Sequence, residues 1–131
     1  MRRFFMLLVV LGLAGVTFAS KPAWAAGQRF VVFFQEWSAA LDKPALQTIA
    51  AAARAAAADP QAKISVTGFA DPLGSVQANV YLTETRAQVV TDQLTADGVA
   101  AARITQHSAG QVPYQLTSQE SRRVIIAVGG P

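Results

Sequence analysis

Cysteine is absent from this 131-residue chain and histidine occurs once, so several classes of chemistry are excluded from the start. Without cysteine there is no disulfide framework, no thiolate metal site, no cysteine nucleophile and no acylated cysteine. A single histidine cannot build a multi-histidine metal centre and argues against a catalytic triad. Charged residues are also scarce, at 15%, but 52% of the residues are hydrophobic, which argues against disorder and allows one ordinary core. We therefore expect one domain and no cofactor or metal.

The N-terminal region holds much of the excess positive charge. Residues 1–3 (MRR) are basic, residues 4–19 (FFMLLVVLGLAGVTFA) are apolar, and residues 23–25 (AWA) form a small-x-small site. This order is typical of a secretory signal peptide, so residues 1–25 are predicted to be removed and residues 26–131 to form the mature domain. The apolar run has 16 residues. A membrane-spanning helix needs roughly 20, so a retained anchor is the weaker alternative.

Cleavage after Ala25 would lower the net charge of the chain from +3 to zero. It removes Arg2, Arg3 and Lys21 and leaves eight basic residues against eight acidic ones. A neutral mature chain has no general attraction to nucleic acid, so no nucleic-acid partner is expected. Membrane contact is expected only through an uncleaved signal segment. An exported chain without cysteine suits the periplasm of a Gram-negative bacterium.

The mature chain shows the periodicity of four strands and two helices. Asp42 and Ser75 are good N-cap residues, and the helices that follow them are expected to end at Asp59-Pro60 and at Gly98. Short β-branched, aromatic or alternating runs predict strands at residues 29–34, 63–69, 104–108 and 124–128. The order β-α-β-α-β-β predicts an α+β fold, a two-layer α/β sandwich with both helices on one face of a mixed four-stranded sheet.

The first predicted helix contains an alanine-rich stretch at residues 50–58. Alanine has the best helix propensity, and its small side chain lets a helix lie close to a sheet. The apolar residues that recur at helical spacing, and that support the prediction of a helix here, are Leu46, Ile49, Ala50, Ala53 and Ala57.

Asp71 and Arg86 are the first candidate ligand residues. Asp71 follows the second predicted strand just before a helix, where polar groups of α/β folds commonly face ligands; the structural alternative is a capping or solvated carboxylate. Arg86 lies among apolar residues of the second predicted helix, so its guanidinium needs a carboxylate partner or a path to water. The residues alone leave two hypotheses open: the two side chains pair with each other, or they share a ligand carrying an amine and a carboxylate.

Arg122 and Arg123 precede the last predicted strand, and their side chains are expected to lie on opposite faces because neighbouring strand residues alternate. One of them can reach the site; the alternative is that both protect an edge strand from aggregation. His107 is interpreted as a structural or surface residue, and Trp37 as a core or rim aromatic. No pair of carboxylates is placed together by the sequence, so an enzyme acting on glycans has little support.

Residues 67–75 (TGFADPLGS) and 79–87 (NVYLTETRA) closely resemble the signature of OmpA-like peptidoglycan-binding domains, G-[HYF]-T-D-x-x-G followed by N-x-x-L-S-x-x-R-A. The interval from Asp71 to Arg86 equals the family's interval between its two ligand residues. Residues 32–41 resemble its opening strand and turn, residues 98–104 its helix-to-strand link, and residues 122–124 its closing N-R-R-V. The resemblance covers nearly the whole mature chain.

This resemblance implies an exported, non-catalytic domain that binds the peptide stem of peptidoglycan non-covalently at the cell envelope. By position, Asp71 would accept hydrogen bonds from the ammonium group of diaminopimelate, and Arg86 would hold its carboxylate in a charge-assisted pair. Asn79 and Arg122 match further positions that line the family's site. The implied partner is therefore peptidoglycan.

The chain also departs from the family pattern. Ala70 stands where threonine is usual, Pro72 stiffens the loop, Ser121 replaces asparagine before the two arginines, and the loop before the last strand is short. These departures keep open an alternative hypothesis, in which the OmpA-like fold is retained as a periplasmic protein-interaction or assembly module with envelope proteins as partners.

Overall fold

The computed structural model describes residues 27–70, 74–111 and 121–130. Within them the chain forms β1 (Gln28–Phe33), α1 (Lys43–Ala58), β2 (Ile64–Ala70), α2 (Val76–Ala96), a 3-10 turn (Ala101–Arg103), β3 (Ile104–Gln111) and β4 (Arg123–Val128). The predicted order of strands and helices is confirmed, and the largest difference is that β3 continues beyond its predicted end at Ser108. The predicted signal peptide and most of the predicted loop before β4 lie outside the described residues.

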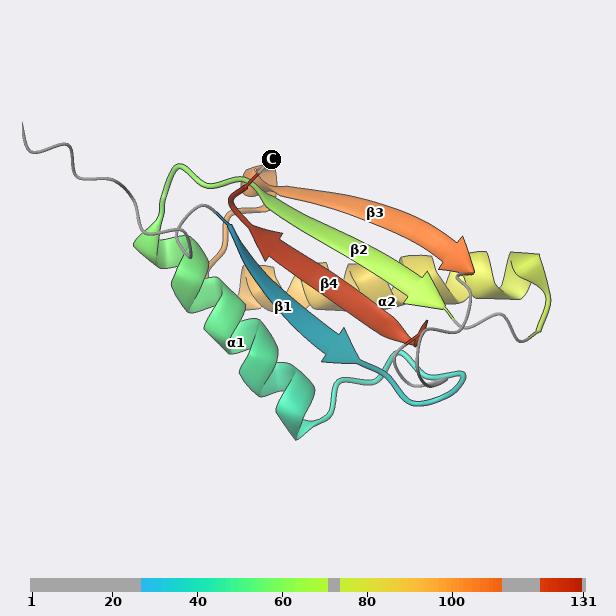
Figure 1. The fold of residues 1–131 in the computed structure, drawn as a ribbon. Coiled ribbons are helices and arrows are strands. Elements are labelled where there is room, and N and C mark those ends of the chain that lie inside the picture. The colour runs from blue at the N-terminus through green and yellow to red at the C-terminus, as the bar shows by residue number, and fades with distance from the viewer. Residues whose placement is uncertain (1–26, 71–73, 112–120, 131) are drawn as a thin grey trace, which may run out of the picture.

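The four strands form one mixed sheet in the order β1-β4-β2-β3 (Figure 1). β4 is antiparallel to both β1 and β2, whereas β2 and β3 are parallel. A parallel pair needs a crossover connection, and α2 supplies it. Within the described part of the chain, β1 and β3 are therefore the edge strands.

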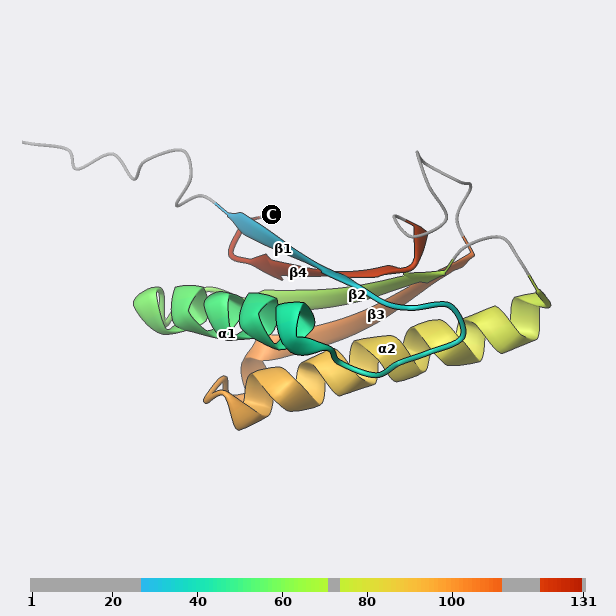
Figure 2. The same cartoon turned by 90° about the horizontal axis from the view of Figure 1, so that it is seen from below.

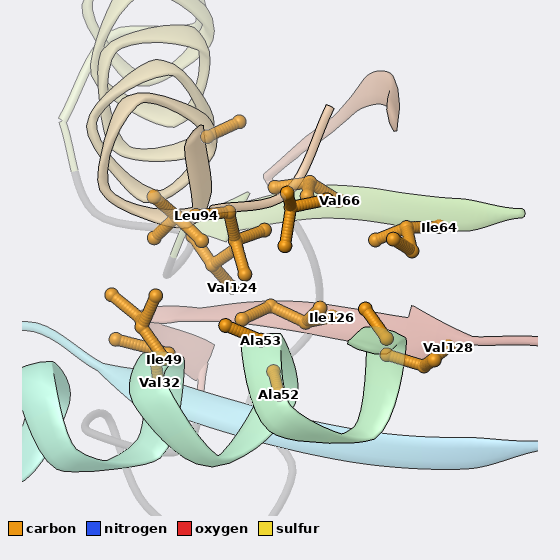
Figure 3. Packing of buried hydrophobic residues seen from close by; sticks show 14 of the residues in the cluster. Val32, Ile49, Ala52, Ala53, Ile64, Val66, Leu94, Val124, Ile126 and Val128 are labelled. Carbon is orange, nitrogen blue, oxygen red and sulfur yellow. The ribbon is translucent and has the colours of Figure 1, made fainter. Parts of the chain in front are cut away.

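Both helices cover the same face of the sheet (Figure 2). Burial alternates residue by residue along β2 and β4, because every second side chain points toward the helices. Completely buried residues from both layers, such as Ile49, Val66, Leu94 and Ile126, form the core between them (Figure 3). This arrangement confirms the predicted α+β two-layer sandwich. Neither helix of the described chain has the length and apolar character that a membrane span requires.

α1 begins as predicted, because Oδ1 of the N-cap residue Asp42 accepts a 2.9 Å hydrogen bond from the N–H of Ala45. The residues that α1 buries are Ala45, Ile49, Ala52, Ala53 and Ala56.

The apolar residues at helical spacing confirm the helix, but not all of them lie on its buried face. Leu46 is 40% exposed, Ala57 is also exposed, and Ala50 is only half-buried. Where neighbouring positions are all alanine, apolar spacing does not define a single helix face, so packing decides which one is buried. The chosen face centres on Ile49 and otherwise presents only alanines, which brings α1 close to the sheet.

Gly68 lets α2 lie unusually close to β2. A Cβ at Gly68 would lie 2.5 Å from the carbonyl oxygen of Thr83, so any side chain here would push the helix away. The same Thr83 places its Oγ1 2.6 Å from Oγ of Ser108 on β3. These contacts fix the position of the helix that carries Asn79 and Arg86.

Arg103 joins the last turn of α1 to the start of β2. Its guanidinium donates hydrogen bonds of 2.7–3.1 Å to the carbonyl oxygens of Ala56, Asp59 and Ala62. A cation at the carbonyl end of a helix also complements the helix dipole. Arg103 is therefore a structural clamp.

Candidate functional site

A small pocket lies where the segment after β1, the first turns of α2 and the start of β4 meet. It is narrow, with about 170 Å³ of empty space when open solvent at its mouth is included, and its lining residues are Glu36, Trp37, Asn79, Leu82, Arg86 and Arg122. Asn79, Arg86 and Arg122 are candidate ligand residues from distant parts of the sequence, and the fold brings all three to this one pocket. Asp71 lies outside the described residues, in the chain segment between β2 and α2.

Arg86 is completely buried, with an exposed fraction of 0%. Its Nε donates to the carbonyl oxygen of Ser38 at 2.8 Å, and its Nη2 donates to that of Gln35 at 2.9 Å. The guanidinium carbon also lies 5.2 Å from the centroid of the Phe34 ring, a cation–π contact. Arg86 therefore ties the segment between β1 and α1 to α2, in addition to lining the pocket.

Asn79 is 1% exposed and lies in the first turn of α2. Its Nδ2 donates to the carbonyl oxygen of Ser75 at 3.1 Å, while Oγ of Ser75 accepts from the N–H of Ala78 at 3.1 Å. The Asn79 amide is thus oriented by the start of the helix, and the same side chain forms part of the pocket wall.

Arg122 and Arg123 lie on opposite faces of the sheet, as the alternation predicted. Arg122 lines the pocket, and its Nε donates to the carbonyl oxygen of Phe34 at 3.3 Å. The guanidinium of Arg123 lies 4.4 Å from the centroid of the Phe69 ring. Phe69 belongs to the β2 residues that point away from the helices. The two neighbouring arginines therefore provide one pocket residue and one residue of like charge outside it.

Trp37 forms the rim of the pocket, which agrees with one of the two interpretations of this residue. It is 54% exposed and has a φ of 52°, in the left-handed region that non-glycine residues seldom adopt. A Cβ at Gly74, whose φ is +85°, would overlap the Trp37 ring. The glycine that ends the D-x-x-G pattern therefore makes room for an aromatic ring from another loop.

Two further pocket residues, Glu36 and Leu82, were not predicted from the individual residues. Glu36 lies in the segment that resembles the family's opening strand and turn, and this was the only sequence signal for it. The departures from the family pattern that the structure describes are both interior: Ala70 is 1% exposed and Ser121 is 0% exposed. Pro72 lies outside the described residues.

The pocket lining combines two guanidinium groups, one carboxylate and one amide. Guanidinium groups recognise carboxylates through charge-assisted hydrogen bonds, and carboxylates recognise ammonium groups. Such a set suits a small zwitterion. In residues 27–70, 74–111 and 121–130, no three His, Asp or Glu side chains come together as metal ligands.

The order β-α-β-α-β-β, with a mixed sheet, both helices on one face and a pocket at the start of α2, defines the class of OmpA-like domains. The sequence profile of the OmpA family matches residues 33–125, and the chain belongs to this family.

Solved structures share the fold. The peptidoglycan-associated lipoprotein from Burkholderia pseudomallei is similar over 76% of this chain and 88% of its own, with a TM-score of 0.66 and 23% identity. The OmpA-like domain of FopA1 from Francisella tularensis matches over 80% and 73%, with a TM-score of 0.67 and 21% identity. The cell wall anchor of the T6SS from Pseudomonas aeruginosa matches over 80% and 82%, with a TM-score of 0.63 and 22% identity. No curated protein sequence matches the chain.

Proposed function

We propose that this protein is a non-catalytic module of the cell envelope that binds peptidoglycan through the diaminopimelate residue of its peptide stem. The observation that carries the proposal is the convergence of Asn79, Arg86 and Arg122 on one pocket at the start of α2. The fold shared with a peptidoglycan-associated lipoprotein and with a cell wall anchor supports it. Export through the signal segment at residues 1–25 would bring the domain to its ligand.

The proposed recognition depends on two opposite charges held apart by the fold. The side chain of diaminopimelate ends in a carbon that carries both an ammonium group and a carboxylate. Asp71 accepts hydrogen bonds from the ammonium group, and the pocket arginines donate to the carboxylate. Either contact alone would also admit a simple amine or a simple acid, whereas both together select the zwitterion.

Arg86 and Arg122 contribute differently to this site. Arg86 is completely buried, and its bonds to Ser38 and Gln35 make it a support for the pocket as well as a wall of it. Arg122 is only half-buried, and its Nε donates to the carbonyl of Phe34 at 3.3 Å, so its removal leaves a smaller void than the removal of Arg86. A substitution of Arg122 therefore tests ligand binding with less risk to the fold.

Co-sedimentation of the purified protein with insoluble sacculi tests the proposal. We expect Asp71→Ala and Arg122→Ala to abolish pelleting, because the loss of one partner of a desolvated charge pair costs about 2–5 kcal/mol. Arg123→Ala is the matched control, since it removes the same charge from the next residue but on the opposite face of the sheet. We expect this control to pellet like the wild type.

Sacculi with lysine in place of diaminopimelate test the identity of the ligand. Lysine keeps the side-chain amine but lacks the carboxylate beside it, so we expect the protein to pellet with diaminopimelate sacculi and not with lysine sacculi. Equal pelleting of wild type, Asp71→Ala and Arg122→Ala would contradict the proposed site. Equal pelleting with both kinds of sacculi would contradict the proposed ligand.

The alternative function is a protein-interaction or assembly module that retains the OmpA-like fold. The observation that favours it is the interior location of two departures from the family pattern, Ala70 and Ser121, beside the elements that form the pocket. Absence of wall binding by the wild type, together with a crosslinked envelope partner whose capture survives Asp71→Ala, would support this alternative.

A further inference from the structure

A second and larger hollow lies beside α2, between this helix and the edge strand β3. It is open to solvent and has about 920 Å³ of empty space when this solvent is included, against about 170 Å³ for the pocket of Asn79, Arg86 and Arg122. Its α2 wall includes Tyr81, Glu84, Gln88 and Val89, and its β3 wall includes Gln106 and Ser108. None of these residues lines the pocket of Asn79, Arg86 and Arg122. We call this hollow the α2/β3 groove.

Up to Ser108, β3 lacks the features with which proteins usually protect an edge strand. Its sequence, ITQHSAGQ, contains no lysine, arginine, acidic residue or proline. Residues 105–109 are all exposed. Its pairing with β2 is regular from Ile104 to Ser108, and the register shift comes only after this stretch. Such an edge offers backbone N–H and C=O groups to another strand.

The floor of the groove is fixed rather than loose. The 2.6 Å contact between Thr83 Oγ1 and Ser108 Oγ joins the helix to the edge strand. Gly68 allows the close approach of α2 to the neighbouring strand β2. The α2 wall of the groove therefore has a fixed position relative to β3. If another strand paired with β3, every second side chain of that added strand would point into the groove.

The groove has a defined chemistry. Tyr81 is 72% exposed and offers an aromatic surface, and Val89 adds an apolar one. Glu84 is exposed and is the one carboxylate among the lining residues, which include no lysine or arginine. The only arginine of α2, Arg86, is completely buried and does not neutralise this surface. The groove therefore favours a partner with a basic side chain.

The same charges disfavour a second copy of this chain as the occupant. Antiparallel pairing of two β3 strands would place the α2 helices, each with an exposed Glu84, on the same face of the joined sheet. β3 has no lysine or arginine to compensate for this repulsion, and its one basic residue is His107, which also lines the groove. A basic strand from another protein meets no such penalty.

We propose that the α2/β3 groove binds an extended, basic segment of a partner protein, which adds a strand to the edge of β3. Main-chain hydrogen bonds to β3 provide affinity, and alternate side chains entering the groove provide specificity. A lysine or arginine pairs with Glu84, and an apolar side chain packs on Tyr81 and Val89. The groove shares no lining residue with the pocket of Asn79, Arg86 and Arg122, so both ligands can be held at once.

The test uses a fluorescently labelled, acetylated peptide of sequence Thr-Lys-Thr-Val-Thr-Lys-Thr as the probe. The fluorescence anisotropy of this peptide is measured while the purified protein is added. Glu84→Lys is expected to weaken binding by about tenfold or more, because it replaces the pairing charge with a repelling one. Asp97→Lys is the matched control, since it makes the same charge change on an exposed residue after α2 but outside the groove. Both positions are on the surface, so neither change threatens the fold.

A second measurement separates strand addition from simple charge attraction. Binding is expected to shift the backbone amide resonances of residues 104–109, and N-methylation of alternate peptide bonds in the probe is expected to abolish it. Equal binding to Glu84→Lys, equal binding of the peptide with glutamate in place of lysine, or unshifted β3 amides would overturn the proposal. Absence of saturable binding at millimolar peptide, or a dimer joined through β3, would also overturn it. Sacculus binding is measured separately, so failure here leaves the proposed function untouched.

Discussion

Arg86 and Arg103 are two arginines that make the same kind of contact at opposite ends of the sheet. Each guanidinium donates to main-chain carbonyl groups that are distant in sequence: Ser38 and Gln35 for Arg86, and Ala56, Asp59 and Ala62 for Arg103. Each therefore holds a connection to α1, Arg86 the segment before the helix and Arg103 the segment after it.

The two arginines differ in what surrounds them. Arg86 is completely buried beside a pocket that also contains Asn79 and Arg122, whereas Arg103 is half-buried and lines no described ligand pocket. Carbonyl binding by an arginine is thus a structural feature in both places. What distinguishes a candidate site from a clamp is the convergence of further polar side chains on the same space.

Arg86→Ala is expected to have the largest effect on stability. It leaves a void in the interior, removes the Arg86 donor from the carbonyl of Ser38 and leaves the carbonyl of Gln35 with only the 3.2 Å bond from the N–H of Ser38 among the bonds described, which should cost roughly 3–5 kcal/mol in the free energy of unfolding. Urea unfolding followed by circular dichroism measures this loss. We also expect peptidoglycan binding to disappear. A loss of less than about 1 kcal/mol in the free energy of unfolding would refute the role of Arg86 as a support.

Arg103→Ala sharpens the comparison because it should separate the two roles. Removal of a charged donor from three carbonyl groups should cost roughly 2–3 kcal/mol, less than at Arg86 because water can reach a half-buried site. Sacculus pelleting at a temperature where the variant is folded should equal that of the wild type. Loss of pelleting would mean that the two ends of the fold are coupled and that Arg103 is more than a clamp.

Gly68→Ala tests whether the pocket around Arg86 depends on the close packing of α2 against β2. The new Cβ would lie 2.5 Å from the carbonyl oxygen of Thr83, so the helix must shift, at a cost of roughly 1–3 kcal/mol. Because α2 carries Asn79 and Arg86, wall binding should also weaken. The Arg103 clamp involves no residue of α2, so amide exchange at the end of α1 should stay unchanged. Accelerated exchange there would contradict this division of the fold.

Most of the fold could be predicted because its signals are local. Asp42 and Ser75 predict where the helices begin, because each N-cap hydrogen bond spans only three residues. The alternation of apolar residues predicts which side chains of β2 and β4 are buried. The buried face of α1 could not be predicted, since a run of alanines carries no periodic signal. The extension of β3 was also missed, because its last residues lack strand propensity and depend on pairing with β2.

The family pattern predicted the candidate site residues. It did not predict the contacts that hold these side chains in place. Neither the carbonyl partners of Arg86, 48 and 51 residues away, nor the overlap of Gly74 with Trp37 has a local signal. The positive φ of Trp37 is likewise a property of the folded loop. Three of the predicted residues, Asn79, Arg86 and Arg122, line the pocket, whereas the contacts that orient them come from chain segments brought together only by folding.

Asp42→Ala should have the smallest effect, and it tests how α1 is held at its two ends. Loss of the N-cap acceptor for the N–H of Ala45 should cost about 1 kcal/mol, while Asp42→Asn, which keeps an acceptor, should cost little. A helix of 16 residues separates Asp42 from the Arg103 clamp by about 24 Å, a distance at which energetic effects usually add. The double variant Asp42→Ala/Arg103→Ala should therefore lose the sum of the two single losses in urea unfolding. A smaller loss would mean that α1 detaches as one unit once either end is released, so the two ends would share a single stabilising role.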